Sequence, residues 1–238
     1  MFDHVTIDPL ALSEDLRRAD DRLLTTISEL SPASVAEASL LPGWTRGHVL
    51  SHIARNADSL NNLLTWARTG VETPAYASPE ARVAGIGAGA DRPLAVQIAD
   101  VAAASGRFAT AIADMPAEAW SYVLSPQQGS AAKVVWRRLR EVEVHHVDLG
   151  AAYTTADWPE GFTQRLIREL VTDRPRANGT NPSIAIHSDE GQSWQLGTGV
   201  PAITVSGPAH ELAGWLSGRS SGSALTSTGP LPTISDWM

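Results

Sequence analysis

The sequence predicts an α+β protein, in which a four-helix bundle is followed by a small α+β domain with a short antiparallel sheet. Up to residue 155, apolar side chains recur at helical spacing, whereas after residue 183 short β-branched runs alternate with glycine and acidic residues. With 43% hydrophobic and 18% charged residues, the 238-residue chain has the composition of a globular protein. We therefore expect a first domain over residues 1–155 and a second over residues 156–238.

The expected helices of the first domain are bounded by typical capping residues. Thr45 follows a Pro-Gly turn and is a suitable N-cap, and Gly70 ends the helix that Thr45 begins. Ser78 and Pro79 provide a cap and a first helical position for a shorter helix. The expected helices cover residues 9–30, 46–68, 78–86, 92–114 and 130–152. The four long helices among them predict the bundle.

Shorter elements are expected in the second domain. A helix through Phe162 and Leu170 comes first, and a later helix begins at Pro208 and closes at Gly218. Between them, short alternating or β-branched runs separated by turn residues predict strands of a small antiparallel sheet. The expected strands cover residues 183–187, 193–196 and 202–205, with a further strand near Leu231–Ile234.

Composition excludes several kinds of chemistry. The chain contains no cysteine, so it has no disulfide, no cysteine-ligated zinc or iron–sulfur cluster, and no thiol nucleophile of its own. Because 26 acidic residues outnumber 18 basic ones and no basic cluster occurs, nucleic acid is not an expected partner. No apolar run is long enough to cross a membrane, and the N-terminus lacks the features of a secretory signal. We therefore expect a cytoplasmic protein that does not bind membranes.

Histidine and carboxylate side chains gather in two of the expected bundle helices. On a helical wheel Glu141 and His145 lie about 40° apart, and Asp148 lies about 20° to the other side of Glu141. His52 likewise lies at the edge of the apolar stripe on the helix over 46–68. When two such polar edges face each other across a bundle, they form a polar pocket of the kind that holds metals. We therefore predict a divalent metal site formed by His52, Glu141 and His145, with at least one open position.

The residue types leave the metal and its outer partners open. Three nitrogen and oxygen ligands plus water are typical of catalytic zinc, but nickel, cobalt, iron and manganese bind similar sets. His48, four residues before His52, is an alternative ligand or an outer partner, and Asp148 or Asn56 is a candidate to orient a liganding histidine. A purely structural interpretation also stands, because Glu–His pairs at i, i+4 occur on helix surfaces. His146 points into the apolar stripe, and we expect it to pack in the core.

Five segments of the sequence resemble the DinB-like, mycothiol-dependent maleylpyruvate isomerase family. The first contains the run Leu-Pro-Gly-Trp-Thr-Arg-Gly-His shortly before His52, and the third places Glu141 and His145 in the family's Glu-x-x-x-His pattern. The segments follow one another in the family's order through nearly the whole chain, and they cover residues 41–54, 71–82, 140–150, 214–219 and 228–229. The resemblance implies a DinB-like helical domain followed by a domain similar to sterol-carrier-type α+β domains.

The resemblance also implies an activity and the residues that carry it. It implies that His52, Glu141 and His145 are the ligands of a zinc ion and that Arg219, in the second domain, acts at the substrate. Because Arg219 follows the helix-ending Gly218, where a cation complements the helix dipole, a structural role for it stays open. The implied reaction converts maleylpyruvate to fumarylpyruvate, a step of the gentisate pathway of aromatic catabolism. The implied partners are this small-molecule substrate and the low-molecular-weight thiol mycothiol.

The absence of cysteine agrees with an external thiol. A thiolate adds to the conjugated C=C bond, the bond becomes single and rotates, and the thiolate then leaves. Two other functions remain open. One is a mycothiol S-transferase that uses the same metal site on a different electrophile. The other is a zinc-dependent binding or regulatory module without enzymatic activity, although redox-sensing modules commonly use the cysteine ligands that this chain lacks.

Overall fold

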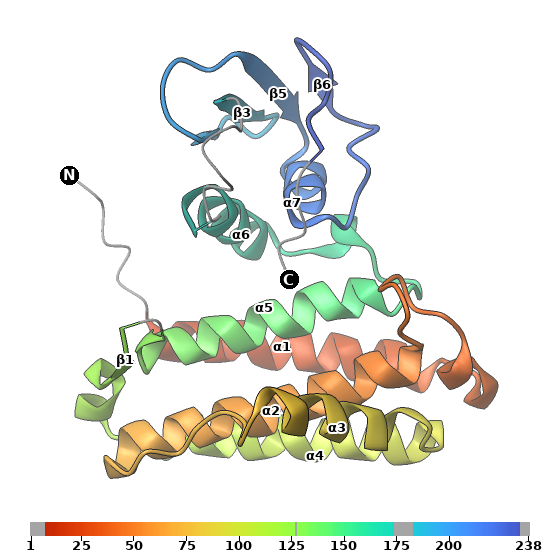
Figure 1. Cartoon of the computed structure of the whole chain (residues 1–238), viewed down its shortest axis with the longest axis vertical. Helices are drawn as coiled ribbons and strands as arrows, with labels where there is room; N and C mark the ends of the chain where they lie inside the picture. Colours follow the sequence, from red (N-terminus) through yellow and green to blue (C-terminus); the bar gives the residue numbers. More distant parts are fainter. Residues whose placement is uncertain (1–7, 127, 174–182, 234–238) are drawn as a thin grey trace. The chain divides into compact units, whose positions relative to one another are not determined.

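The computed structural model of the chain describes residues 8–126, 128–173 and 183–233. The chain divides into two compact units, Met1–Ala152 and Tyr153–Met238. The expected domain boundary after residue 155 lies three residues beyond this division. Figure 1 shows a helical first unit and a second unit in which helices accompany a small sheet. The α+β fold class predicted from the sequence is confirmed.

The first unit is built from five α-helices. The helix α1 packs against α4 and α5, and α2 packs against α3, α4 and α5, so that four long helices form the bundle and α3 lies along α2 (Figure 1). The α-helices are α1 (Pro9–Ser28), α2 (Arg46–Thr69), α3 (Pro79–Ala90), α4 (Leu94–Ala113) and α5 (Ala132–Asp148). All five predicted helices are confirmed, and α3 extends to Ala90, four residues beyond its expected end.

The helix ends follow the capping chemistry of the sequence. The Thr45 side chain accepts a hydrogen bond from the His48 backbone N–H at 3.3 Å, and the Thr45 backbone N–H donates to His48 Nδ1 at the same distance. These reciprocal bonds form a capping box that fixes the first turn of α2. Gly70 ends α2 in the left-handed region, with φ of 71°, which costs glycine little.

Short elements connect the helices of the first unit and were not predicted. Three 3₁₀ turns lie in the described chain, and a two-stranded antiparallel hairpin precedes α5. This hairpin explains why α5 begins at Ala132 instead of residue 130. The elements are η1 (Pro32–Ala36), η2 (Ala117–Ser121), β1 (Val123–Ser125), β2 (Gly129–Ser130) and, in the second unit, η3 (Thr155–Asp157).

The second unit contains a mixed four-stranded sheet with the order β4-β3-β5-β6. The pairs β3–β4 and β5–β6 are antiparallel, as expected, but β3 and β5 are parallel. The parallel pair arises because β5 lies on the side of β3 opposite to β4. The helices α6 and α7 pack against each other, and α7 contacts β3 and β5. The elements are α6 (Glu160–Asp173), β3 (Ile184–Ser188), β4 (Ser193–Leu196), β5 (Ile203–Gly207), α7 (Ala209–Ser217) and β6 (Thr226–Ser227).

The strand expected near Leu231–Ile234 is wrong where the structure tests it. Residues 231–233 form no strand, and Ile234 lies outside the described residues. The reason is that Pro230 and Pro232 flank Leu231, and proline has no N–H to donate to a neighbouring strand. The fourth strand of the sheet is instead β6. Among the described helices, none has the length and apolar content that crossing a membrane requires; the compartment stays a prediction.

Candidate metal centre

The side chains of His52, Glu141 and His145 meet between α2 and α5. His52 Nε2 lies 3.0 Å from Glu141 Oε2 and 3.0 Å from His145 Nε2, and His145 Nε2 lies 3.4 Å from Glu141 Oε2. The two imidazoles are buried, and the Glu141 side chain is 13% exposed. The three residues that the helical wheels predicted as ligands therefore place three electron-rich atoms around one point, and one edge of the cluster is accessible.

The donor set fits a divalent metal ion. Three ligands bound at about 2.0–2.1 Å to a tetrahedral ion lie ~3.3 Å apart. The three distances of 3.0–3.4 Å observed here bracket that separation. Two imidazole nitrogens and one carboxylate oxygen form the kind of set in which a fourth position is left for water or substrate.

Asp148 orients one of the histidines. Its Oδ2 accepts a hydrogen bond from His145 Nδ1 at 2.8 Å, so that His145 Nε2 is the nitrogen with a free lone pair, directed at the cluster. His52 is held differently, because its Nδ1 is buried without a hydrogen-bond partner among the described residues. The indole of Trp44 packs edge-on against the His52 ring, with 5.6 Å between the ring centroids. The ring of His52 is therefore positioned by packing.

The electrostatics of the centre favour an ionised carboxylate. Burial acts to raise the pKa of Glu141, but its hydrogen bonds to His145 and His52 outweigh burial and hold that pKa well below its usual value. Burial lowers the pKa of His52 and so favours the neutral imidazole. Burial acts in the same direction on His145, but the Asp148 and Glu141 carboxylates outweigh it and raise that pKa. A metal ion that binds here meets a carboxylate and a neutral imidazole, and releases a proton from His145 when that ring is charged.

Backbone contacts hold α2 and α5 together at the end that carries the centre. The Arg46 guanidinium donates to the carbonyl of Leu149 at 2.8 Å and to that of Gly150 at 2.9 Å. The Leu40 backbone N–H donates to the Asp148 carbonyl at 2.9 Å. Because Arg46 is the first residue of α2, these bonds tie the start of that helix to the end of α5 and set the separation between His52 and His145.

A buried arginine lies next to the centre and was missed by sequence reasoning. The Arg138 side chain is fully buried, and its Nη1 donates to the Ile53 carbonyl at 2.7 Å and to Asn56 Oδ1 at 3.1 Å. Its Nη2 reaches Ser105 Oγ at 3.3 Å and lies 3.7 Å from Asp20 Oδ1. Arg138 thus joins all four bundle helices. The helical wheel of α5 could have indicated that Arg138 is buried, because it places Arg138 about 20° from both Leu149 and His145, at the edge of the buried stripe.

The other candidate residues have identifiable partners. His48 Nδ1 contacts Thr45 Oγ1 at 2.8 Å in the capping box, which accounts for its position without a metal. His146 is buried and contacts Thr26 Oγ1 at 2.8 Å, as expected for a core histidine. Asn56 Oδ1 accepts from Arg138, and neither ring nitrogen of His52 contacts Asn56 among the described residues, since Nδ1 lacks a partner and Nε2 faces Glu141 and His145. Arg219 lies in the second unit, where its Nη1 donates to the Ser217 carbonyl at 2.7 Å; its action at a substrate stays a prediction.

Comparison with known proteins decides the family. The family described as the mycothiol maleylpyruvate isomerase N-terminal domain matches residues 16–150, and the one described as the MDMPI C-terminal domain matches residues 157–235. The chain belongs to the mycothiol-dependent maleylpyruvate isomerase family. This is a family of enzymes, and its two domains cover both compact units of the chain.

Two solved structures of this family resemble the whole chain. A crystal structure of the mycothiol-dependent maleylpyruvate isomerase is 30% identical, with a TM-score of 0.90, and all of each chain is covered. A structure described as the H52A mutant of the mycothiol-dependent maleylpyruvate isomerase is 29% identical over the same coverage, with a TM-score of 0.89. No curated protein sequence matches the chain. The fold of the mycothiol-dependent maleylpyruvate isomerase family therefore extends over both units.

Proposed function

We propose that this protein is a cis–trans isomerase that converts maleylpyruvate to fumarylpyruvate with mycothiol as a thiol cosubstrate. The observation that carries the proposal is the buried cluster of His52, Glu141 and His145, in a chain that matches both domains of the isomerase family. The solved relative over the full length is described as a mycothiol-dependent maleylpyruvate isomerase. The wider assignment, to an enzyme that takes a small molecule and a thiol, rests on the same support.

The chemistry requires a nucleophile that the chain does not contain. Rotation about an intact C=C bond is too slow, so a thiolate adds to the conjugated alkene and its electron pair forms a new C–S bond. The alkene electrons move toward the neighbouring carbonyl, the former double bond rotates as a single bond, and the electrons return as the thiolate leaves. No atom is gained or lost overall. Because the sequence contains no cysteine, the thiol comes from the cosubstrate.

We propose that His52, Glu141 and His145 hold a divalent metal ion, and that this ion is zinc. When bound, such an ion supplies a positive charge that lowers the pKa of a coordinated thiol toward neutrality. Asp148 keeps the lone pair of His145 Nε2 directed into the centre. We propose further that Arg219 binds a substrate carboxylate, because a guanidinium offers two parallel N–H donors to that group.

The test combines turnover with metal analysis. We would measure maleylpyruvate isomerisation by the zinc-loaded protein with and without mycothiol, and compare His52→Ala with His187→Ala as a matched control. His187 is exposed on β3, where its Nδ1 contacts Ser193 Oγ at 2.8 Å. We expect thiol-dependent turnover and bound zinc in the parent and in the control, and loss of both in His52→Ala.

Each other result points to a different function. Bound zinc and bound mycothiol without isomerisation would refute the isomerase and favour an S-transferase that acts on another electrophile. Bound zinc without thiol binding would favour a non-enzymatic module. Retention of zinc and turnover by His52→Ala would refute the assignment of the metal ligands.

A further inference from the structure

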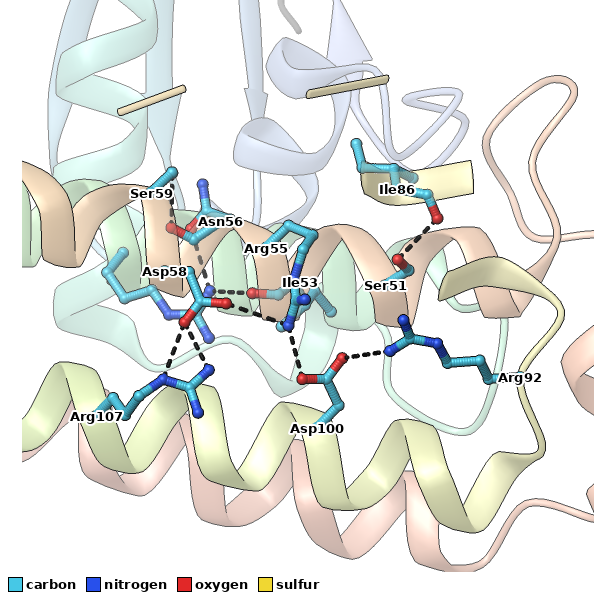
Figure 2. Close-up of polar contacts among 11 residues, drawn as sticks. Ser51, Ile53, Arg55, Asn56, Asp58, Ser59, Ile86, Arg92, Asp100 and Arg107 are labelled. Atoms are coloured by element: carbon cyan, nitrogen blue, oxygen red, sulfur yellow. Dashed lines mark hydrogen bonds and ion pairs between the residues drawn. The ribbon is translucent and has the colours of Figure 1, made fainter. Parts of the chain in front are cut away.

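The helix α3 is fixed along α2 by contacts that set the register between them. Ser51 Oγ donates to the Ile86 carbonyl at 2.8 Å (Figure 2), and a Cβ atom on Gly47 would lie 2.0 Å from the Ala90 carbonyl oxygen. Residue numbers therefore rise along α3 as they fall along α2, so the two helices are antiparallel. Close contact at Gly47 leaves little freedom for α3 to slide or rotate.

This register places Arg82 level with Arg55, which lies in the turn of α2 that begins at His52. Arg82 lies one helical turn before Ile86, which corresponds to a step of about 6 Å along α3. On the antiparallel α2 the same step leads from Ser51 into the turn that begins at His52. Arg82 therefore lies beside the turn of α2 that carries His52.

Arg82 lacks the carboxylate partner that neighbouring arginines have. Figure 2 shows Arg55 and Arg107 contacting Asp58, while Arg55 and Arg92 contact Asp100. The closest approach in each of these four ion pairs is between 2.6 and 3.4 Å. By contrast, no carboxylate within the described residues lies at salt-bridge distance from Arg82, which is partly buried.

An aromatic ring supports the guanidinium. The Arg82 guanidinium carbon lies 6.0 Å from the centroid of the Tyr76 ring, at the outer limit of a cation–π contact. The Tyr76 hydroxyl is itself buried and has no hydrogen-bond partner among the described residues. A partly buried cation without an anion and a buried hydroxyl without a partner are both costly unless a ligand completes them.

We propose that Arg82, assisted by Tyr76, binds a carboxylate of the dicarboxylate substrate beside the metal centre. This inference rests on the proposed function. A guanidinium and a phenol hydroxyl are hydrogen-bond donors suited to a carboxylate. Mycothiol carries no carboxylate, so this pair selects the electrophile and not the thiol. Since the substrate has two carboxylates, the role is compatible with the one proposed for Arg219.

The test compares Arg82→Gln with Arg68→Gln. Arg68 lies on α2, four and a half turns from His52; it is exposed and has no carboxylate partner among the described residues, so its removal causes the same change in net charge. We would measure kcat/KM for maleylpyruvate, KM for mycothiol and zinc content, and follow by calorimetry the binding of maleate, a stable dicarboxylate. We expect Arg82→Gln to lose about 10²-fold in kcat/KM and most of its maleate affinity, with zinc and the KM for mycothiol unchanged. Arg82→Lys should recover part of the loss, and Tyr76→Phe should show a smaller one.

Several outcomes would overturn the inference. Parent-like kcat/KM and maleate affinity in Arg82→Gln would do so, as would an equal loss in Arg68→Gln, which would indicate a general charge effect. Loss of zinc from Arg82→Gln would assign Arg82 a structural role instead. Failure of the proposed function can be told apart from failure of this inference. In the first case the parent would not isomerise maleylpyruvate, but binding of maleate that depends on Arg82 would still support a dicarboxylate site.

Discussion

Replacing Asp148 with asparagine tests whether a buried carboxylate sets the metal affinity of the centre. Asp148 Oδ2 accepts from His145 Nδ1 at 2.8 Å, and the two side chains are only 2% and 7% exposed, so water cannot take over the role. Loss of such a partner typically costs about 10–100-fold in metal affinity. Because both groups are buried, we expect a value near the upper end, and 100-fold corresponds to about 2.8 kcal/mol. The measurement is zinc competition against a chromophoric chelator at fixed pH.

Glu143→Gln is the matched control for this substitution. Glu143 is a similarly buried carboxylate on α5, and its Oε1 accepts from Arg22 Nη2 at 2.5 Å. We expect the control to lower stability and to leave zinc affinity unchanged. Zinc affinity of Asp148→Asn within threefold of the parent would refute the reasoning, and so would an equal loss of affinity in Glu143→Gln.

The remaining predictions concern the buried network below the centre. Arg138→Met leaves Asp20 without its buried cation and should lower the free energy of unfolding by about 3–5 kcal/mol, measured by urea denaturation; adding Asp20→Asn should recover part of this loss, and additive effects would contradict the coupling. Burial raises the pKa of Asp20 above 3.8, although Arg138 and Ser105 oppose the shift and Asp21 adds to it. The folded state therefore holds this proton to higher pH than the unfolded state, so stability from this group falls as pH rises from 3.8 through the raised pKa. Urea denaturation of the parent at a series of pH values should show this fall in the free energy of unfolding, and Asp20→Asn should lack it. An unchanged dependence of stability on pH in Asp20→Asn would contradict the assignment.

Helices and their faces were predictable because the information is local. Capping residues such as Thr45 and Gly70 act on their own helix, and an apolar stripe identifies the buried face without knowledge of the neighbour. The same local geometry predicted that Glu141 and His145 lie together. His52 was added on one assumption, that the polar edges of two helices face each other. The structure brings these three side chains together, while their binding of a metal stays a prediction.

What the sequence did not predict depends on which elements become neighbours. The parallel pairing of β3 with β5 requires knowing on which side of β3 the later strand lies, and local alternation is the same for both sides. Arg138 is buried because Asp20, Asn56 and Ser105 arrive from three other helices to bind it. The lack of a carboxylate beside Arg82 is likewise visible only when all its neighbours are known.

The ligands of the centre are far apart along the chain, since His52 and Glu141 are separated by 89 residues. An unfolded chain therefore offers a metal ion little more than the Glu141–His145 pair, whereas the folded bundle offers all three groups. By mass action, free metal at about 1,000 times its dissociation constant adds ~4.1 kcal/mol to the free energy of unfolding. If the centre binds a metal as proposed, starving a cell of that metal would raise the unfolded fraction and its clearance by proteases, so that metal supply would regulate the amount of this enzyme as well as its activity.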